Sequence, residues 1–217
     1  MFLGHFGVAL AAKRAAPSAS LGALLLATQF ADLLWPVLLL AGIEQVRITE
    51  GANPLLNLEF TAYPYSHSLL TQVAFGILLG GAYRLIGGTR HAAWIVGLLV
   101  PSHWLLDWIV HVPDLPLYPG DASRYGLGIW RSLPLTLVIE IVVFGAGAVV
   151  YLRTTEARDR IGRWSFAAFA AFLLLAYVAS LLGPPPPSVQ VLAWSALAIW
   201  LLPSWAYWFD RHRRVRR

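Results

Sequence analysis

The sequence predicts an all-α protein, a polytopic membrane helix bundle of six spanning helices plus an N-terminal half-helix. Of its 217 residues, 58% are hydrophobic and only 12% are charged, whereas a soluble domain carries about 25% charged residues. The mean hydropathy is +0.64. Ten Trp and eight Tyr suit the aromatic belts of the two membrane–water interfaces. We therefore interpret residues 1–217 as a single integral-membrane domain.

Six segments are long and apolar enough to cross a bilayer, for which a helix needs about 20 residues. Lys13 and Arg14 precede the first of them, an arrangement that a signal peptide would share. Its apolar run is too long for a signal peptide and no small-residue cleavage site follows, so we expect it to be retained. The predicted spans are Ser20–Gly42, Ser68–Ile86, Ala92–Val112, Ser132–Leu152, Trp164–Gly183 and Val189–Phe209.

The distribution of Lys and Arg predicts how these spans are oriented. Thirteen of the sixteen basic residues fall in one alternating set of loops and termini, and only Arg47, Arg124 and Arg131 fall in the other. The positive-inside rule then places the C-terminus in the cytoplasm and loops 43–67 and 113–131 outside, for a protein of the inner membrane. We expect the basic tail after Phe209 to contact anionic lipid headgroups rather than nucleic acid.

Residues 1–12 precede the cytoplasmic Lys13–Arg14 pair and are too few to span. We expect a half-helix that runs from mid-membrane to the inner surface, with His5 about 12 Å above that surface. The alternative is an interfacial amphipathic helix with a solvated His5.

Seven ionisable side chains lie at membrane depth or at its outer edge, where such groups are costly and usually mark a site or a pathway. The four-residue spacing of His103, Asp107 and His111 aligns these three on one stripe of a helix. The helical rise places Asp32 and Glu140 at a similar depth, about 13–14 Å below the outer surface. The seven candidate metal ligands are His5, Asp32, His67, His103, Asp107, His111 and Glu140.

The position of these groups divides the chain into two parts. Residues 1–152 hold the predicted metal-site helices, and residues 164–209 form a supporting helical pair without charged side chains. The loop acids are expected to be solvated, and Ser66 is a candidate cap for the second span. These acids are Glu44, Glu50, Glu59, Asp114 and Asp121.

Imidazole and carboxylate donors in a chain without Cys suit Zn²⁺, with Mn²⁺ or Fe²⁺ possible. One zinc ion takes about four ligands, so seven candidates favour two ions. Two ions would activate water and hold the attacking and leaving oxygens of a phosphoester. Asp32 and Glu140 are also the candidate catalytic carboxylates, and Arg131 and Arg124 are the candidate substrate-binding residues. For any single residue, the alternative is an interhelical hydrogen bond.

This pattern resembles the YdjM-like family of predicted membrane-bound metal-dependent hydrolases of bacterial and archaeal inner membranes. The resemblance covers roughly residues 1–145. The order of ligands is also similar, at a distance, to the zinc-dependent phospholipase C and single-strand nuclease superfamily, which implies that Asp32 is a ligand or a general base and that His5 is an early N-terminal ligand. The matching features are Phe-Leu-Gly-His5-Phe, Asp32, Tyr-Ser-His67-Ser-Leu, the His103-x3-Asp107 pair and Glu140.

The expected function is therefore metal-dependent hydrolysis of a phosphoester of a lipid or lipid-linked substrate, with membrane lipids and no nucleic acid as partners. A zinc-dependent lipid amidase, similar in logic to the alkaline ceramidases, would need one ion and no arginine for an anion. A metal or proton transporter would need polar groups on both sides of the midplane, and the inner halves of the first four spans are almost entirely apolar. No feature of the sequence specifies an oligomeric state.

Overall fold

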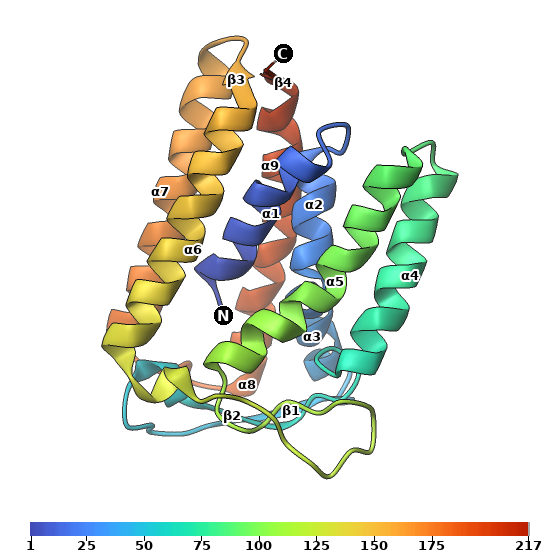
Figure 1. Ribbon diagram of the computed structural model, residues 1–217. Helices are drawn as coiled ribbons and strands as arrows, with labels where there is room; N and C mark the ends of the chain where they lie inside the picture. Colours follow the sequence, from blue (N-terminus) through green and yellow to red (C-terminus); the bar gives the residue numbers. More distant parts are fainter. Residues whose placement is uncertain (217) are drawn as a thin grey trace.

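Helices lie side by side as a bundle in the structure, a computed structural model that describes residues 1–216 (Figure 1). At one end, which we call the hairpin end, strands β1 (Gln45–Ile48) and β2 (Leu58–Ala62) pair in antiparallel fashion. At the other, which we call the tail end, β3 (Thr155–Ala157) pairs antiparallel with β4 (Arg213–Val215). The predicted all-α bundle is thus broadly confirmed, with small strands only at its two ends.

Four helical stretches within residues 1–216 are long and apolar enough to cross a membrane. They are α5 (Arg90–Val110), α6 (Leu133–Thr154), α7 (Arg160–Leu182) and Val189–Arg211, the last made of α8 (Val189–Ala196), η3 (Leu197–Trp200) and α9 (Leu201–Arg211). The pair α2 (Leu21–Thr28) and α3 (Phe30–Leu40) would add a fifth span, bent by 55°. Helix α4 (Leu69–Leu85) is apolar but has only 17 residues. Six spans are therefore not confirmed.

Helix α1 (Leu3–Ala15) begins inside the bundle and runs to the tail end (Figure 1). It packs against α6, α2 and α5, and His5 is fully buried. The alternative of an interfacial helix with a solvated His5 is therefore wrong. Because α1 begins inside the bundle, its first turn lies beside those parts of the neighbouring helices that are nearer the hairpin end.

Two glycine contacts allow neighbouring helices to approach closely. A Cβ on Gly147 of α6 would overlap the carbonyl oxygen of Gly7 in α1, and a Cβ on Gly76 of α4 would overlap that of Gly97 in α5. Small residues at such crossings let backbones touch, which is the common way that helices associate in a membrane. These contacts hold α1, which carries His5, and α5, which carries His103 and Asp107.

Side-chain caps fix where several helices begin. Ser68 accepts the N–H of Thr71 at the start of α4, and Thr89 accepts the N–H of Ala92 at the start of α5. Such caps satisfy backbone donors that have no partner within the helix. The cap of α4 is Ser68 and not Ser66, so the prediction for Ser66 is wrong by two residues, and the Ser66 hydroxyl is available for another role.

The basic tail folds back onto the bundle. Arg213 is only 7% exposed, and its guanidinium donates to the carbonyl oxygens of Gly162 and Thr155. Arg214 pairs with Glu156 at 2.6 Å. The expectation that the whole tail contacts lipid headgroups is therefore wrong for Arg213, because β4 pairing buries this side chain.

Candidate metal centre

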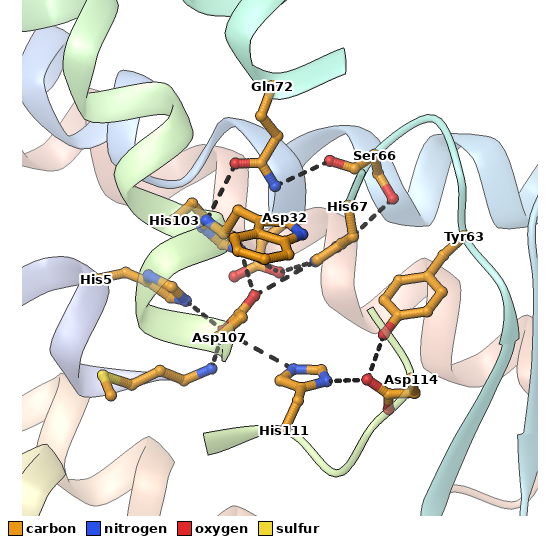
Figure 2. Close-up of polar contacts among 12 residues, drawn as sticks. His5, Asp32, Tyr63, Ser66, His67, Gln72, His103, Asp107, His111 and Asp114 are labelled. Atoms are coloured by element: carbon orange, nitrogen blue, oxygen red, sulfur yellow. Dashed lines mark hydrogen bonds and ion pairs between the residues drawn. The ribbon is translucent and has the colours of Figure 1, made fainter. Parts of the chain in front are cut away.

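Five of the predicted ligands form two overlapping groups of potential metal ligands. His5, His103 and Asp107 make one group, and Asp32, His67 and His103 make the other. In each group, one donor atom from every residue lies within 4.8 Å of the others. Figure 2 shows these side chains gathered around Asp107. They come from α1, α3, α5 and the turn before α4, so four segments distant in sequence meet here.

Asp107 lies at the middle of the cluster, and its two oxygens face different histidines. Oδ1 lies 3.1 Å from Nε2 of His5 and 3.8 Å from Nε2 of His111. Oδ2 lies 3.0 Å from Nε2 of His103 and 3.9 Å from Nε2 of His67. The amino group of Met1 also forms an ion pair with Oδ1. One carboxylate therefore contacts or faces all four imidazoles.

Asp32 completes the second group from α3. Its Oδ1 lies 3.5 Å from Nε2 of His67 and 3.7 Å from Nε2 of His103. Its side chain is 29% exposed, whereas that of Asp107 is 2% exposed. Asp32 is thus the more exposed carboxylate of the two groups.

Hydrogen bonds to Nδ1 leave Nε2 of three histidines directed at the carboxylates. His103 Nδ1 donates to the backbone oxygen of Thr28 at 2.7 Å, and a carbonyl oxygen can only accept. His111 Nδ1 lies 3.0 Å from Oδ1 of Asp114. Fixing one ring nitrogen this way sets the tautomer and orients the other for a metal. Nε2 of His103 is buried 3.0 Å from Oδ2 of Asp107, yet the two atoms do not have the geometry of a hydrogen bond.

His67 is held by a chain of two further side chains. Its Nδ1 lies 2.7 Å from Oγ of Ser66, and this hydroxyl donates to Oε2 of Glu44 at 2.6 Å. Glu44 is 2% exposed and its Oε1 also accepts the backbone N–H groups of Tyr65 and Ser66. The prediction that Glu44 is a solvated loop charge is wrong, because the β1–β2 hairpin folds it under the turn that carries His67.

Two other loop acids are also engaged rather than free in solvent. Asp114 accepts from His111 and from the hydroxyl of Tyr63 at 2.6 Å. Burial and the Asp114 carboxylate raise the pKa of Tyr63, which keeps its hydroxyl a donor. Asp121 is 8% exposed, and backbone N–H groups of Leu117 and Ser123 lower the pKa of its carboxyl. The sequence offers no signal for these pairings, since they depend on how two long loops fold over one another.

Glu140 and His111 lie next to the cluster and outside the two groups. Glu140 accepts the backbone N–H groups of Phe2 and Gly4, each at 2.8 Å. It therefore holds the first turn of α1, which carries His5. The ring of His111 lies against Trp130, with ring centroids 3.9 Å apart.

The two predicted substrate-binding arginines are not beside the cluster. Both are exposed. Arg124 lines a separate pocket of about 330 Å³ with Tyr63, Asp114 and Asp121. Arg131 lines neither this pocket nor the large cavity described next.

A cavity of about 1080 Å³ opens from the cluster, a volume at the upper end of ordinary ligand sites. Asp32, His67, Asp107, His111 and Glu140 line one part of it. Most of the remaining wall is apolar and comes from η1 (Pro54–Leu56), α7, α8, η3 and α9. The predicted supporting helical pair is thus also a wall of the space beside the site.

The donor set fits a divalent transition metal. It consists of imidazole nitrogens and carboxylate oxygens, which suit Zn²⁺, Mn²⁺ and Fe²⁺. The convergent Nε2 atoms and the orphaned Nε2 of His103 are what such an ion would satisfy. No protein-family model, no curated protein sequence and no solved structure matches this chain.

Proposed function

We propose that this protein is a membrane-embedded, metal-dependent hydrolase that cleaves a phosphoester of a lipid or lipid-linked substrate. The observation that carries the proposal is the convergence of histidine Nε2 atoms on Asp107 and Asp32 at the wall of a large apolar cavity. Burying this many ionisable groups is costly, and a structural role would not require a cavity beside them.

The geometry around Asp107 suggests how the donors divide between two ions. Oδ1 faces His5 and His111, whereas Oδ2 lies on the side of His103 and His67. One imidazole nitrogen binds one ion, so His5, His111 and Asp107 would form one set. Asp32, His67 and His103 would form the other, with Asp107 shared. Zn²⁺ is the expected ion, and Mn²⁺ or Fe²⁺ fit the same donors.

The proposed chemistry divides between the ions and the chain. Bound divalent ions supply Lewis acidity and lower the pKa of water. The Asp32 carboxylate, the more exposed acid of the cluster, accepts the proton as water adds to phosphorus. The phosphorus–oxygen ester bond then breaks, and the proton held by Asp32 passes to the leaving oxygen, giving an alcohol and a phosphate product. Glu140 acts by positioning, since it anchors the turn of α1 that carries His5.

The proposed membrane placement follows from the basic residues. Lys13, Arg84, Arg153 and the basic tail lie toward the tail end, which would be cytoplasmic, and the site would open toward the outer side. Counting the bent α2–α3 pair and α4 as spans would give the six crossings that the sequence predicts. The short α4 would cross with the help of local bilayer thinning.

The second candidate is a lipid amidase, and the placement of the arginines favours it. Neither Arg124 nor Arg131 lines the large cavity, although phosphate recognition usually employs arginine. An amide substrate needs no such group. One bound ion rather than two would also favour this alternative.

Elemental analysis of protein purified without chelator tests the centre first. We expect about two ions per chain in the wild type, about one in Asp32→Ala, and a loss of both in Asp107→Ala. The matched control is Glu59→Gln, which changes an exposed carboxylate of β2 and should keep both ions. Absence of metal from the wild type contradicts the proposal.

Assays on lipid phosphoesters and lipid amides, with the metal-loaded wild type and Asp32→Asn, then separate the two chemistries. Phosphoester cleavage that Asp32→Asn abolishes supports the first candidate. Amide cleavage by a protein with one ion supports the second.

A further inference from the structure

The large cavity has two chemically different parts. Within residues 1–216, the charged or imidazole side chains that line it are all at the metal centre and at Glu140. The part farther from the centre is formed by α7 and the α8–α9 stretch, with side chains such as Phe172, Ala176, Ile199 and Leu201. A ligand that fills both parts must therefore be polar at one end and apolar along the rest.

The apolar part of the cavity reaches the surface of the bundle near the midpoints of two helical stretches. Phe172 lines the cavity and is 47% exposed, and Leu201 lines it and is 69% exposed. Phe172 lies near the middle of Arg160–Leu182, and Leu201 near the middle of Val189–Arg211. If these stretches cross a bilayer, the opening between them faces hydrocarbon rather than water.

Contacts on either side define the extent of this opening. Toward the tail end, the rings of Phe172 and Trp205 meet edge to face at 5.9 Å, and those of Phe169 and Phe209 lie 5.4 Å apart. Toward the hairpin end, the wall continues into the connection Gly183–Pro186, which also lines the cavity. Between Phe172 and this connection, Ala176, Ser180 and Ala198 line the cavity with small side chains.

We propose that this part of the cavity binds one hydrocarbon chain of a membrane lipid, which enters sideways between α7 and the α8–α9 stretch. The chain would lie along Ala176 and Ile199, with the polar ester group of the same lipid at the metal centre. The inference rests on the proposed function for the identity of that ester, but chain binding itself requires no turnover. Apolar walls, a mid-span opening and continuity with the polar centre favour a lipid chain over a soluble ligand.

Photolabelling in bilayer nanodiscs tests the proposal. The probe is a phosphatidylcholine with a diazirine midway along one acyl chain, and mass spectrometry locates the labelled residues. In the wild type we expect labels on cavity residues of α7 and α8–α9. Ala176→Trp fills the space and should reduce this labelling about tenfold, equivalent to about 1.4 kcal/mol.

Ala171→Trp is the matched control, because Ala171 is an exposed residue of α7 that does not line the cavity. In the Ala171→Trp variant, labelling of the cavity residues should equal that in the wild type. Ala196→Phe, which fills the opposite wall, provides a second test if Ala176→Trp does not fold. Equal labelling of cavity and outward-facing residues, unchanged by either filling variant, overturns the inference and indicates surrounding lipid only.

The outcome is separable from that of the proposed function. Asp32→Asn should lose hydrolysis and keep cavity labelling, with folding checked by its circular dichroism. Cavity labelling in a protein that cleaves neither phosphoester nor amide would leave the chain site standing and remove the hydrolase proposal. Hydrolysis together with labelling that Ala176→Trp and Ala196→Phe do not alter would support the hydrolase proposal and remove the chain site.

Discussion

Helix α1 carries one member of each of two buried polar clusters, and the clusters differ in how completely they are satisfied. Near its end, Lys13 donates to Asp210 and to the carbonyl oxygen of Ala19, both at 2.7 Å. Asp210 also accepts from the hydroxyl of Tyr151 and the N–H of Leu21, at 2.8 and 2.9 Å. We call Lys13, Tyr151 and Asp210 the tail-end cluster.

Near the start of the same helix, His5 belongs to the metal centre, where the pattern is the opposite. Nδ1 of His5 and Nε2 of His103 are buried without hydrogen-bond partners, whereas no side-chain atom of the tail-end cluster is orphaned within residues 1–216. The metal centre also adjoins a large cavity. A cluster whose polar atoms are all hydrogen-bonded is complete as a structural contact. Unpartnered imidazole nitrogens in a cluster whose other members line a cavity indicate a site that takes a ligand.

The largest expected effect is a loss of stability when the tail-end cluster is broken. Asp210→Ala leaves the Lys13 ammonium and the Tyr151 hydroxyl buried without their partner, because Lys13 is 6% and Tyr151 0% exposed. Removing one partner of a buried ion pair costs about 3–5 kcal/mol. We expect a clear drop in unfolding temperature, followed by circular dichroism in detergent, with unchanged metal per folded chain.

Glu156→Ala is the control for that change. It removes an ion pair at the same end whose side chains are 40% and 64% exposed, and exposed pairs contribute little. If Asp210→Ala lowered metal content without lowering stability, the distinction between the two clusters would be wrong.

The second prediction weakens the metal centre without touching a ligand. Ser66→Ala removes the hydroxyl that joins Nδ1 of His67 to Glu44. Loss of such a supporting hydrogen bond typically weakens metal binding about 10–100-fold. Competition with a chromogenic chelator measures the change, and we expect it to exceed any change in unfolding temperature.

Ser102→Ala is the matched control, since this hydroxyl donates only to the backbone oxygen of Leu99 within α5. Metal affinity that Ser66→Ala leaves at the wild-type value would contradict the role assigned to the Glu44–Ser66–His67 chain.

The sequence predicts most of the helices because the length of an apolar run is a local property. The expected segments coincide closely with α4, α5, α6 and α7, and the segment 189–209 coincides with α8–α9. The bend between α2 and α3 is not predicted, although Pro36 lies inside α3. A Pro in a helical run is a common cause of a kink. Here the bend lies instead at Gln29, where α2 ends and α3 begins.

The candidate ligands could be found for a similar reason. His103 and Asp107 are one helical turn apart, and apolar surroundings make any ionisable residue conspicuous. The supporting residues could not be found, because Glu44 and Asp114 lie in polar loops where acids are ordinary. Lys13 and Asp210 are 197 positions apart, and a single sequence contains nothing that links them.

The smallest expected effect is the effect of pH on the stability of the tail end. A third polar contact lies there, and its side chains are partly exposed and hydrogen-bonded. Asp159 accepts the N–H of Gly162 and lies 2.6 Å from Nδ1 of His212. The Gly162 N–H, and then His212, lower the pKa of the Asp159 carboxyl. A lowered pKa in the folded protein means that this carboxylate stabilises the fold above the ordinary carboxyl pKa. The contribution is lost as the pH falls through the lowered value.

Acidification should therefore loosen the tail before it affects the tail-end cluster behind it. We expect lower protection factors in hydrogen exchange for residues 155–163 and 212–216 at acid pH, and Asp159→Asn should show these lower values already at neutral pH. Glu156→Gln, which changes a residue three positions before Asp159 that pairs with Arg214, should keep the wild-type profile. The change should be small because the two side chains are 30% and 45% exposed, and water screens their interaction. Identical exchange in Asp159→Asn and wild type would contradict this prediction. It would show that β3–β4 pairing and the buried Arg213 hold the tail without the Asp159–His212 contact.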